Sequence, residues 1–423
     1  MDFLVQNPDV VRRAIEVKGV DLDLDRVLDL HSQAKALLGQ VEELRRERNV
    51  LSKRTASTTD DERASLIERS RQIGQELKNL EPALREQQEQ LHELLLLVPN
   101  IPNPDEPVGR DDDDNVELRR WGEPPQFSFS ARDHVELLEL HDWADLGRIG
   151  RVAGSRMYTL KGEMVQLELA LWRFAAEFMR ERDFTLIDLP SLAREAAFIG
   201  TGHFPSGRED VYRLAEDDLY LSGTAEVALN YLHSGEVLSH SDLPIRYAGL
   251  STCFRREAGA AGRDARGLVR VHQFYKVEQF VICTADKEES ARWFETLLAN
   301  GEALVQALEL PYRLVRTCTG TMGAGKVRMW DIECWVPSQQ TYRETHSVSE
   351  LYDWQARRSD LRYRDEDGKV QYCYTLNNTA IATPRILVPF LEVHQQADGT
   401  VRVPEQLRQH LSGAEVLGTP RQA

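Results

Sequence analysis

The sequence predicts an α+β fold in which an antiparallel sheet is flanked by helices and preceded by an N-terminal arm of two long helices. Two observations support this prediction. Between residues 30 and 98, apolar residues recur with alternating three- and four-residue spacing, which is typical of a coiled-coil seam. Further along the chain, strand-like runs follow one another as hairpins, without the regular strand–helix alternation of a parallel sheet.

Length and composition limit the class of protein. A chain of 423 residues with 41% hydrophobic and 29% charged residues is long enough for two or more globular domains. The formal net charge of -17 argues against binding of nucleic acid over the whole surface, but it is compatible with a local basic patch. Every apolar stretch is shorter than the roughly 20 residues that cross a bilayer, so we expect a cytoplasmic protein that does not bind a membrane.

The cysteines indicate neither a disulfide framework nor a metal site. There are five of them, scattered along the chain and never in a Cys-x-x-Cys pair. This odd number and spacing are typical of reduced, mostly buried thiols. We therefore expect no zinc.

Residues 1–98 form the first predicted domain. Asn7 and Pro8 can begin a short helix, because asparagine is a good N-cap and proline suits the first helical position. From about residue 26 to residue 98, two heptad runs predict helices of roughly 35 residues each that fold back as an antiparallel coiled-coil arm. The polar, hydroxyl-rich segment 52–61 separates the runs and is the predicted turn.

A basic cluster lies near the predicted tip of this arm. It consists of Arg45, Arg46, Arg48, Lys53 and Arg54. Two interpretations are open: the cluster is a solvated helix face, or it contacts the phosphate backbone of a nucleic acid.

The rest of the chain divides into a linker and a second domain. Residues 99–127 are rich in proline and aspartate, which predicts a linker. Residues 128–423 form the predicted second domain. Its helices are expected at 160–182 and 291–310, its strands at 184–190, 214–221, 326–336 and 341–347, and a final strand and helix within 371–396.

A hairpin lies at the centre of this domain. Its predicted strands, Ile245–Glu257 and Val269–Val281, are joined by a loop rich in glycine and alanine. Alternation sorts the second strand into a core face and a polar face. The core face carries Val269, Val271, Val277 and Val281, and the polar face carries Arg270, His272, Phe274 and Glu278. The polar face suits a ligand with phosphates and a flat base; the alternative is a solvated strand pair with surface ion pairs.

Side chains must hold any nucleotide, because neither a P-loop nor a Gly-x-Gly-x-x-Gly motif occurs. Arg255 and Arg385 each offer a planar guanidinium for a phosphate. We expect Thr383 to cap a helix that starts at Pro384, so that Arg385 lies in its first turn and forms an anion site. The alternative is a purely structural arginine.

Two further pairs provide oxygen atoms for a ligand. Glu344 and Ser347 could hold Mg²⁺ through hard oxygens. Thr224 and Glu226 place a hydroxyl and a carboxylate on one face, which suits an ammonium group and a small polar side chain. Each pair alone is weak evidence for a ligand site.

As a set, these segments resemble the class II aminoacyl-tRNA synthetases, and in particular the seryl-tRNA synthetase family. The resemblance begins at Phe254–Glu257, which is similar to motif 2 of the class, and it covers essentially the whole chain. Other matching segments occur in the expected order: Pro99–Asn103, Pro107–Gly109, Gly200–His203, Thr224–Glu226, His272–Phe274, Lys276–Glu278, Asp353–Arg358 and Thr375–Arg385.

The resemblance implies ATP-dependent activation of L-serine to seryl-adenylate and transfer to the 3′ end of tRNA(Ser), with tRNA(Sec) as an open second substrate. The implied ATP site comprises Arg255, Arg256, Glu257, Arg270, Val271, Phe274, Glu344, Thr345, His346, Ser347 and Arg385. The implied catalytic residues within it are Arg255, Glu257 and Arg385, and the implied Mg²⁺ ligands are Glu344 and Ser347. The implied serine pocket comprises Thr224, Ala225, Glu226, Glu278 and Thr379.

The resemblance also implies a homodimer whose second domain is catalytic. The basic cluster motivates the hypothesis that the arm binds tRNA through Arg45, Arg46, Arg48, Lys53 and Arg54. The last motif departs from the commoner family pattern Asn-Gly-Ser-Gly followed by Gly-Arg. Here Asn378, Thr379 and Pro384 stand at the variant positions. Threonine keeps a hydroxyl and proline suits a helix start, so we expect activity to survive.

Two other functions compete with this one. An amino acid:carrier-protein ligase would form the adenylate but would not need the arm. A catalytically dead relative that acts as an RNA-binding regulator would have lost its phosphate-binding residues. Arg255, Glu344 and Arg385 are all present, as is the arm, so we favour the synthetase.

Overall fold

The computed structural model describes residues 1–55, 60–259 and 266–419. The chain folds into two compact units, Met1–Ile101 and Pro102–Ala423, and each is described by itself. None of the helices within the described ranges is long and apolar enough to cross a membrane.

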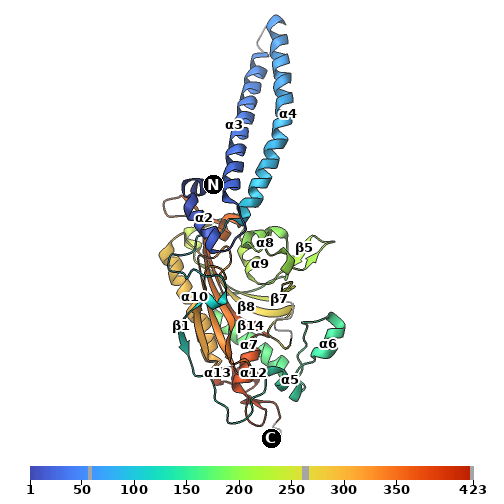
Figure 1. Cartoon of the computed structure of the whole chain (residues 1–423), viewed down its shortest axis with the longest axis vertical. Coiled ribbons are helices and arrows are strands. Elements are labelled where there is room, and N and C mark those ends of the chain that lie inside the picture. The colour runs from blue at the N-terminus through green and yellow to red at the C-terminus, as the bar shows by residue number, and fades with distance from the viewer. Residues whose placement is uncertain (56–59, 260–265, 420–423) are drawn as a thin grey trace. The chain divides into compact units, whose positions relative to one another are not determined.

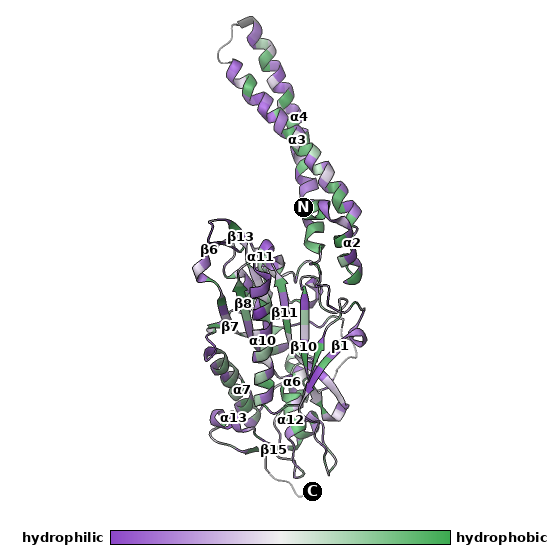
Figure 2. Ribbon diagram, turned by 90° about the vertical axis from the view of Figure 1, so that its left-hand side faces the viewer, coloured by the Kyte–Doolittle hydropathy of each residue, from purple (hydrophilic) through white to green (hydrophobic). Residues whose placement is uncertain are grey.

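The first unit consists of four helices: α1 (Asp2–Gln6), α2 (Pro8–Val17), α3 (Leu24–Thr55) and α4 (Asp60–Leu97). As expected, α2 begins after Asn7 with Pro8 at its first position. Helices α3 and α4 lie side by side and antiparallel, which confirms the predicted helical arm (Figure 1). Apolar and polar residues are mixed along both helices (Figure 2). The seam between them buries Val41, Leu51, Leu66, Ile73, Leu77 and Leu84.

The predicted turn at 52–61 is too long. Helix α3 continues through Thr55 and α4 starts at Asp60, so only residues 56–59 separate them, and these lie outside the described residues. The hydroxyl of Thr55 donates to the carbonyl of Leu51 at 2.8 Å. A hydroxyl that favours a turn in sequence is therefore satisfied inside the helix.

The second unit is built on an eight-stranded sheet of order β1-β9-β10-β11-β14-β8-β7-β2. All neighbouring strands are antiparallel except β2 and β7, which are parallel. The strands are β1 (Val116–Trp121), β9 (Tyr312–Arg316), β10 (Arg328–Val336), β11 (Thr341–Tyr352), β14 (Tyr374–Thr383), β8 (Gln273–Cys283), β7 (Ile245–Phe254) and β2 (Thr185–Asp188).

Three small sheets accompany the main one. They are formed by β3 (Leu192–Ala193), β5 (Leu219–Leu221) and β4 (Arg213–Leu214); by β13 (Val370–Tyr372), β12 (Arg362–Arg364) and β6 (Val237–Ser239); and by β15 (Val401–Arg402) and β16 (Val416–Leu417). The α-helices of this unit are α5 (His134–Leu140), α6 (Leu146–Ala153), α7 (Glu163–Arg180), α8 (Glu195–Thr201), α9 (Glu226–Tyr231), α10 (Lys287–Ala307), α11 (Trp354–Ser359), α12 (Leu387–His394) and α13 (Glu405–Arg408).

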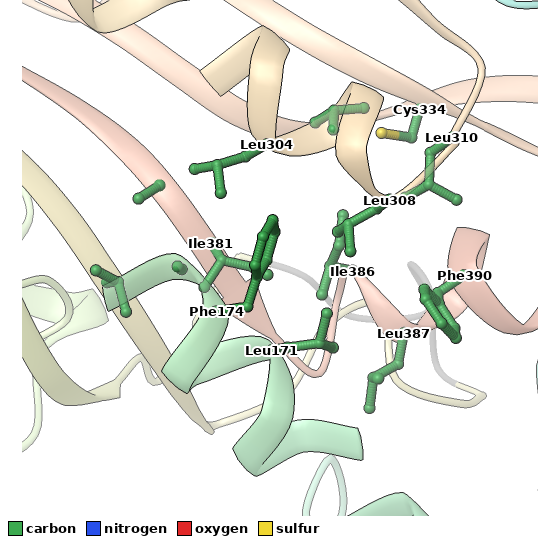
Figure 3. Packing of buried hydrophobic residues seen from close by; sticks show 14 of the residues in the cluster. Leu171, Phe174, Leu304, Leu308, Leu310, Cys334, Ile381, Ile386, Leu387 and Phe390 are labelled. Atoms are coloured by element: carbon green, nitrogen blue, oxygen red, sulfur yellow. The ribbon is translucent and has the colours of Figure 1, made fainter. Parts of the chain in front are cut away.

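The two faces of the main sheet have different cores. On one face, α7, α10 and α12 pack against the strands, as the side chains of Phe174, Leu304, Ile381 and Phe390 show (Figure 3). On the other face, a smaller apolar cluster joins α9 and α11 to the sheet. Strand β8 contributes to both: Val277 and Val281 belong to the first core and Phe280 and Ile282 to the second. Alternation placed Val277 and Val281 on the core face correctly, but the other face, which was expected to be polar, carries an apolar cluster at Phe280 and Ile282.

The structure corrects three predicted boundaries. The predicted linker 99–127 contains β1, which pairs with β9 at the edge of the sheet. The central hairpin is shorter than expected, because β7 ends at Phe254 and β8 starts at Gln273. Helix α12 starts at Leu387, so Pro384 and Arg385 lie in a turn before it and not in its first turn. Residues 260–265 of the predicted hairpin loop lie outside the described residues.

Gly202 ends α8 in a left-handed conformation, with φ of 77°. A Cβ atom there would lie 2.0 Å from Cη2 of the buried Trp354. We predict that Gly202→Ala lowers the free energy of unfolding by about 1 kcal/mol through backbone strain and by a further ~1–3 kcal/mol through overpacking. Thermal and denaturant unfolding will measure the loss.

Gly235 provides the matched control, because its φ is 78° and nothing lies within 4 Å of an added Cβ atom. Gly235→Ala should show the backbone cost alone. Equal losses in the two variants would contradict the packing argument.

Candidate active site

A cavity opens on the β8 face that carries Phe274 and Lys276. Eight of the residues implied to bind ATP line it, and six of them are Arg255, Glu257, Phe274, Glu344, Thr345 and Arg385. Arg270 and Val271 line it as well, from the segment before β8. Val271 was expected on the opposite face from Arg270, but residues 269–272 are not part of a strand and do not alternate.

A β-bulge in β11 decides which of its side chains face the cavity. Glu333 of β10 pairs with Glu344, and Ile332 pairs with His346, so Thr345 is the extra residue. Residues three apart on a regular strand point to opposite faces, but the bulge brings Glu344 and Ser347 to the same face. Glu344 lines the cavity, whereas Ser347 is not among its lining residues. That the two share a face depends on an irregularity that the sequence did not reveal.

A second bulge lies in the neighbouring strand β14. Thr379 pairs with Glu278 and Ile381 with Val277, which leaves Ala380 as the extra residue. Ala382, the partner of Lys276, consequently shares a face with Thr379. Both residues line the cavity.

His346 connects the two bulges. Its Nε2 donates to the carbonyl of Ala380 at 3.0 Å, and its Nδ1 accepts from Oγ1 of Thr345 at 2.9 Å. Burial lowers the pKa of His346 to about 4, so the ring is neutral at physiological pH. The ring lies on the core side of the sheet, and it does not line the cavity. The side chain of His346 therefore joins the two bulges, and its expected contact with ATP stays a prediction.

The two arginines implied for the phosphates both reach the cavity. The guanidinium of Arg255 lies 5.1 Å from the ring centroid of Phe274, and its Nε donates to the carbonyl of Gly223 at 3.3 Å. Nη1 of Arg385 lies 3.7 Å from Oε1 of Glu344. The site thus presents two planar cations that are held by weak contacts and can turn to an anionic ligand.

Arg256 does not join the site. Its guanidinium donates to the carbonyl of Glu209 at 3.0 Å, and its backbone amide donates to that of Asp210 at 2.8 Å. The side chain therefore anchors the segment after β7 to the insertion that contains β4 and β5. Its inclusion among the ATP residues is not supported by this geometry.

Two positioning features of the ATP side were missed from the sequence. Glu257 forms an ion pair with Arg270. Arg156, which has a φ of 57°, accepts a bond from the amide of His272 at 3.1 Å and donates to the carbonyl of Arg270 at 3.4 Å. Arg156 therefore holds the non-strand segment that carries Arg270 and Val271. Its place in the sequence, outside every motif described above, does not reveal this role.

The implied serine pocket is a buried polar network beside the cavity. Thr224, Glu278 and Thr379 meet there, since Thr379 and Glu278 are strand partners and Oγ1 of Thr224 lies 3.5 Å from Oε2 of Glu278. Burial raises the pKa of Glu278, whereas its ion pair with Lys276 acts against that rise. Lys276 was missed, although its position between Phe274 and Glu278 on the same face could have revealed it.

Glu226 is fixed by two amides that come from other elements. Its Oε1 accepts from Gln355 of α11 at 2.6 Å and from Asn377 of β14 at 2.8 Å. Such charge-assisted bonds hold a carboxylate in place without neutralising it. Ala225, in contrast, is 1% exposed and packs into the apolar cluster under α9, so its side chain is part of the core.

Several cations expected to bind tRNA are paired within the arm. Arg45 bonds Glu81 at 2.8 Å, and Arg54 lies 3.4 Å from Glu62. Exposed pairs of this kind contribute only about 0–1 kcal/mol and can exchange for phosphate. A groove near the tip was not predicted; it is lined by Ser52, Thr55, Arg63, Ile67, Ser70 and Arg71.

Comparison with known proteins identifies the family. The seryl-tRNA synthetase N-terminal domain matches residues 1–102, and the class II tRNA synthetase core domain (G, H, P, S and T) matches residues 211–394. A serine–tRNA ligase of Deinococcus radiodurans is 57% identical over 420 residues, which cover 99% of each chain. The chain belongs to the seryl-tRNA synthetase family.

Other members of the family agree with this assignment. A serine–tRNA ligase of Rubrobacter xylanophilus is 43% identical over 99% of each chain. The crystal structure of seryl-tRNA synthetase from Pyrococcus horikoshii complexed with ATP matches with a TM-score of 0.91 and 38% identity, covering 100% of this chain and 99% of that one. The cytoplasmic serine–tRNA ligase of Naegleria fowleri in complex with AMP matches with a TM-score of 0.86 and 27% identity, covering 97% of this chain and 96% of that one. The predicted fold class is confirmed.

We predict that His346→Phe weakens ATP binding, because the bulges at Thr345 and Ala380 lose the side chain that joins them. His394→Phe is the matched control: His394 is also buried, its pKa is also lowered to about 4, and it donates to the carbonyl of Leu308 at 2.8 Å, away from the cavity. Each variant should lose ~1–3 kcal/mol of unfolding free energy. Only His346→Phe should raise the dissociation constant for ATP measured by calorimetry; equal effects on ATP binding would contradict the proposed role.

The pH dependence of stability provides a second readout of the same variants. The folded-state pKa of about 4 lies below the ordinary value near 6.5, so protonation favours the unfolded chain. The stabilisation is fully present above pH 6.5 and is lost as the pH falls towards 4. Each substitution should reduce the slope of unfolding free energy in that window by about 1.4 kcal/mol per pH unit.

Proposed function

We propose that the protein is a serine–tRNA ligase that activates L-serine with ATP and transfers the seryl group to the 3′ end of tRNA(Ser). One observation carries this proposal. A cavity with two arginines suited to phosphate lies next to a buried pocket that contains a carboxylate and a hydroxyl, on the same face of β8. The first part suits a nucleoside triphosphate, and the second suits a small amino acid with a hydroxyl. The full-length match to serine–tRNA ligases supports this assignment.

The first step is attack of the serine carboxylate on the α-phosphorus. A bond forms between a carboxylate oxygen and that phosphorus, the bond to the bridging oxygen breaks, and pyrophosphate leaves. We assign Arg255 to the α-phosphate and Arg385 to the γ-phosphate, with Phe274 and Arg270 around the adenine and Glu257 at its edge. No side chain needs to act as an acid or base, so catalysis is positioning and electrostatics.

The second step transfers the seryl group. A ribose hydroxyl of the terminal tRNA nucleotide attacks the carbonyl carbon of seryl-adenylate, and AMP leaves. Glu226, Glu278, Thr224 and Thr379 hold the amino acid throughout. The carboxylates pair with the ammonium group of serine, and Glu278 accepts a hydrogen bond from its hydroxyl. Alanine has no hydroxyl, so its binding leaves this buried acceptor unpaired.

We further propose that Mg²⁺ binds with ATP at Glu344 and Ser347. The residues fit a hard cation, because Glu344 lines the cavity and Ser347 is the strand partner of the buried Asp331, so that oxygen-bearing side chains gather on one face of β10 and β11. Within the described ranges, no cluster of three or more His, Cys, Asp and Glu side chains could hold a metal ion by itself. The phosphates must therefore complete the coordination. When bound, Mg²⁺ neutralises charge on the departing pyrophosphate.

Serine-dependent exchange of pyrophosphate with ATP, run beside tRNA(Ser) charging on one preparation, tests the function. We expect exchange with serine, at least ~100-fold less with alanine, and charging of tRNA(Ser), all abolished by chelation of Mg²⁺. Exchange without charging would identify a carrier-protein ligase instead. Absence of both would indicate a non-catalytic RNA-binding relative.

The arm is the proposed tRNA-binding element, through its basic cluster of Arg45, Arg46, Arg48, Lys53 and Arg54 and the neighbouring groove. The double variant Arg63→Ala/Arg71→Ala should weaken tRNA(Ser) charging. The slope of the logarithm of the binding constant against the logarithm of the salt concentration should become shallower, as expected for the loss of about two phosphate contacts. Serine-dependent exchange should stay unchanged. Arg12→Ala, which removes an exposed arginine of α2, is the control. Unaltered charging in the double variant would contradict a role for the groove.

We also propose a homodimer, in the cytoplasm where tRNA is charged. Helix α7 exposes Leu169 (63%) and Val165 (38%) beside a polar remainder, an apolar patch that a second copy would cover. Leu169→Arg should convert a particle of about twice 48.3 kDa to the monomer in sedimentation. Val108 is also 63% exposed and belongs to the segment before β1 and not to α7, so Val108→Arg should leave the dimer intact. A monomeric wild-type protein would refute the dimer.

A further inference from the structure

Lys276 is a buried cation that the function described above leaves without a role. It lies on β8 between Phe274 and Glu278, on the face that forms the site, and it is only 7% exposed. Its Nζ donates to Oγ1 of Thr224 at 2.8 Å and forms an ion pair with Oε2 of Glu278. Glu278 and Thr224 are themselves 2% and 4% exposed. A buried ammonium group must be paired to offset its lost hydration, and the two partners of Lys276 are residues of the serine pocket.

The three side chains form a closed triangle. Lys276 bonds Thr224 and Glu278, and Oγ1 of Thr224 lies 3.5 Å from the same Oε2 of Glu278. Both contacts to the carboxylate therefore converge on Oε2. The other oxygen, Oε1, is the one that can accept a bond from a substrate hydroxyl. A carboxylate held at one oxygen by two groups cannot rotate to follow a ligand of different shape.

We propose that Lys276 is a specificity-determining positioning residue, which clamps Oε2 of Glu278 so that Oε1 is a fixed, anionic acceptor for the side-chain hydroxyl of serine. This inference rests on the proposed function. Lys276 acts through Glu278 and does not itself touch the reacting atoms. It is the chemical reason why the pocket selects a hydroxyl-bearing amino acid.

The clamp supports selectivity because it keeps the acceptor charged. Burial raises the pKa of Glu278, and the Lys276 ammonium opposes that rise. Without the ammonium, the carboxyl becomes protonated more easily and can rotate. A neutral carboxyl that can rotate forms hydrogen bonds with neighbouring protein groups. Binding of alanine, which offers no hydroxyl, then no longer leaves a buried acceptor unpaired. The other titratable groups that act on this pair are Glu226 of α9, Arg255 after β7, Cys253 of β7 and His203 after α8.

The experiment compares the wild-type protein with Lys276→Met, which keeps the length of the side chain and removes its charge. The affinities of non-hydrolysable seryl- and alanyl-sulfamoyl adenylates are measured by calorimetry between pH 6 and 9. We expect Lys276→Met to lower the seryl/alanyl affinity ratio at least about tenfold. The ratio should partly recover as the pH rises and Glu278 ionises. Lys276 also lines the ATP cavity, so the KM for ATP in exchange is measured beside it; the loss in the seryl/alanyl ratio should exceed any change in that KM, because Arg255 and Arg385 are retained.

A double-mutant cycle isolates the action through Glu278. Glu278→Gln removes the charge that Lys276 is proposed to hold, so adding Lys276→Met to it should change the seryl/alanyl ratio by less than about twofold. This pair also covers the case in which Lys276→Met alone fails to fold, since replacing both charges avoids an unpaired buried ion. Lys287→Met is the control: Lys287 lies at the start of α10 over the ring of Tyr352, and its variant should match the wild type.

Two results would overturn the inference. An unchanged seryl/alanyl ratio in Lys276→Met would make Lys276 a structural counter-ion only. Independent, additive losses in the double variant would mean that Lys276 contacts the substrate directly. Failure of the proposed function looks different: the wild-type protein itself would then show no serine-dependent exchange and no preference for the seryl analogue.

Discussion

Two extra residues in adjacent strands determine the geometry of the whole site. A regular pleat would send Glu344 and Ser347 to opposite faces, and would likewise separate Thr379 from Ala382. The bulges at Thr345 and Ala380 remove that conflict at the same level of the sheet. The neutral, buried ring of His346 bonds both bulges and so ties two local irregularities into one unit. Everything that faces the cavity from β11 and β14 depends on this unit.

The sheet can hold this polar site because its two faces differ in how much apolar surface they bury. Behind the strands, a large apolar core packs against α7 and α10 and supplies most of the stabilisation. In front, polar groups are buried but satisfied: Glu226 by two amides, and Glu278 by Lys276 and Thr224. Buried charges cost free energy unless they are paired. The polar part of the second face therefore contributes the geometry of the site, while the larger apolar core on the first face and the smaller cluster under α9 and α11 on the second contribute stability.

The helices of the arm and the core face of the central strand could be predicted from the sequence, because one repeating pattern of apolar residues extends over each of these segments. The heptad spacing of the arm and the alternation of β8 gave correct helices and a correct core face, because each repeats over many residues. Predictions failed where the period breaks. Bulges, the turn at Pro384, and the non-strand segment 269–272 leave no periodic signal. The edge strand β1 was hidden in a segment whose prolines and aspartates resemble a linker, since pairing with β9 overrides that composition.

The side chains that lie away from the cavity also share a functional cause. Arg256 and His346 were assigned to ATP because they are neighbours of real cavity residues, yet the chain turns each of them away to anchor the backbone on which those residues stand. Arg156 and Lys276 were not predicted because their partners are distant in sequence. Arg156 bonds the carbonyl of Arg270, and Lys276 bonds the hydroxyl of Thr224. A motif read from sequence names the chain segment that approaches a ligand. Only the three-dimensional contacts distinguish the side chains that reach the ligand from those that hold the segment in place.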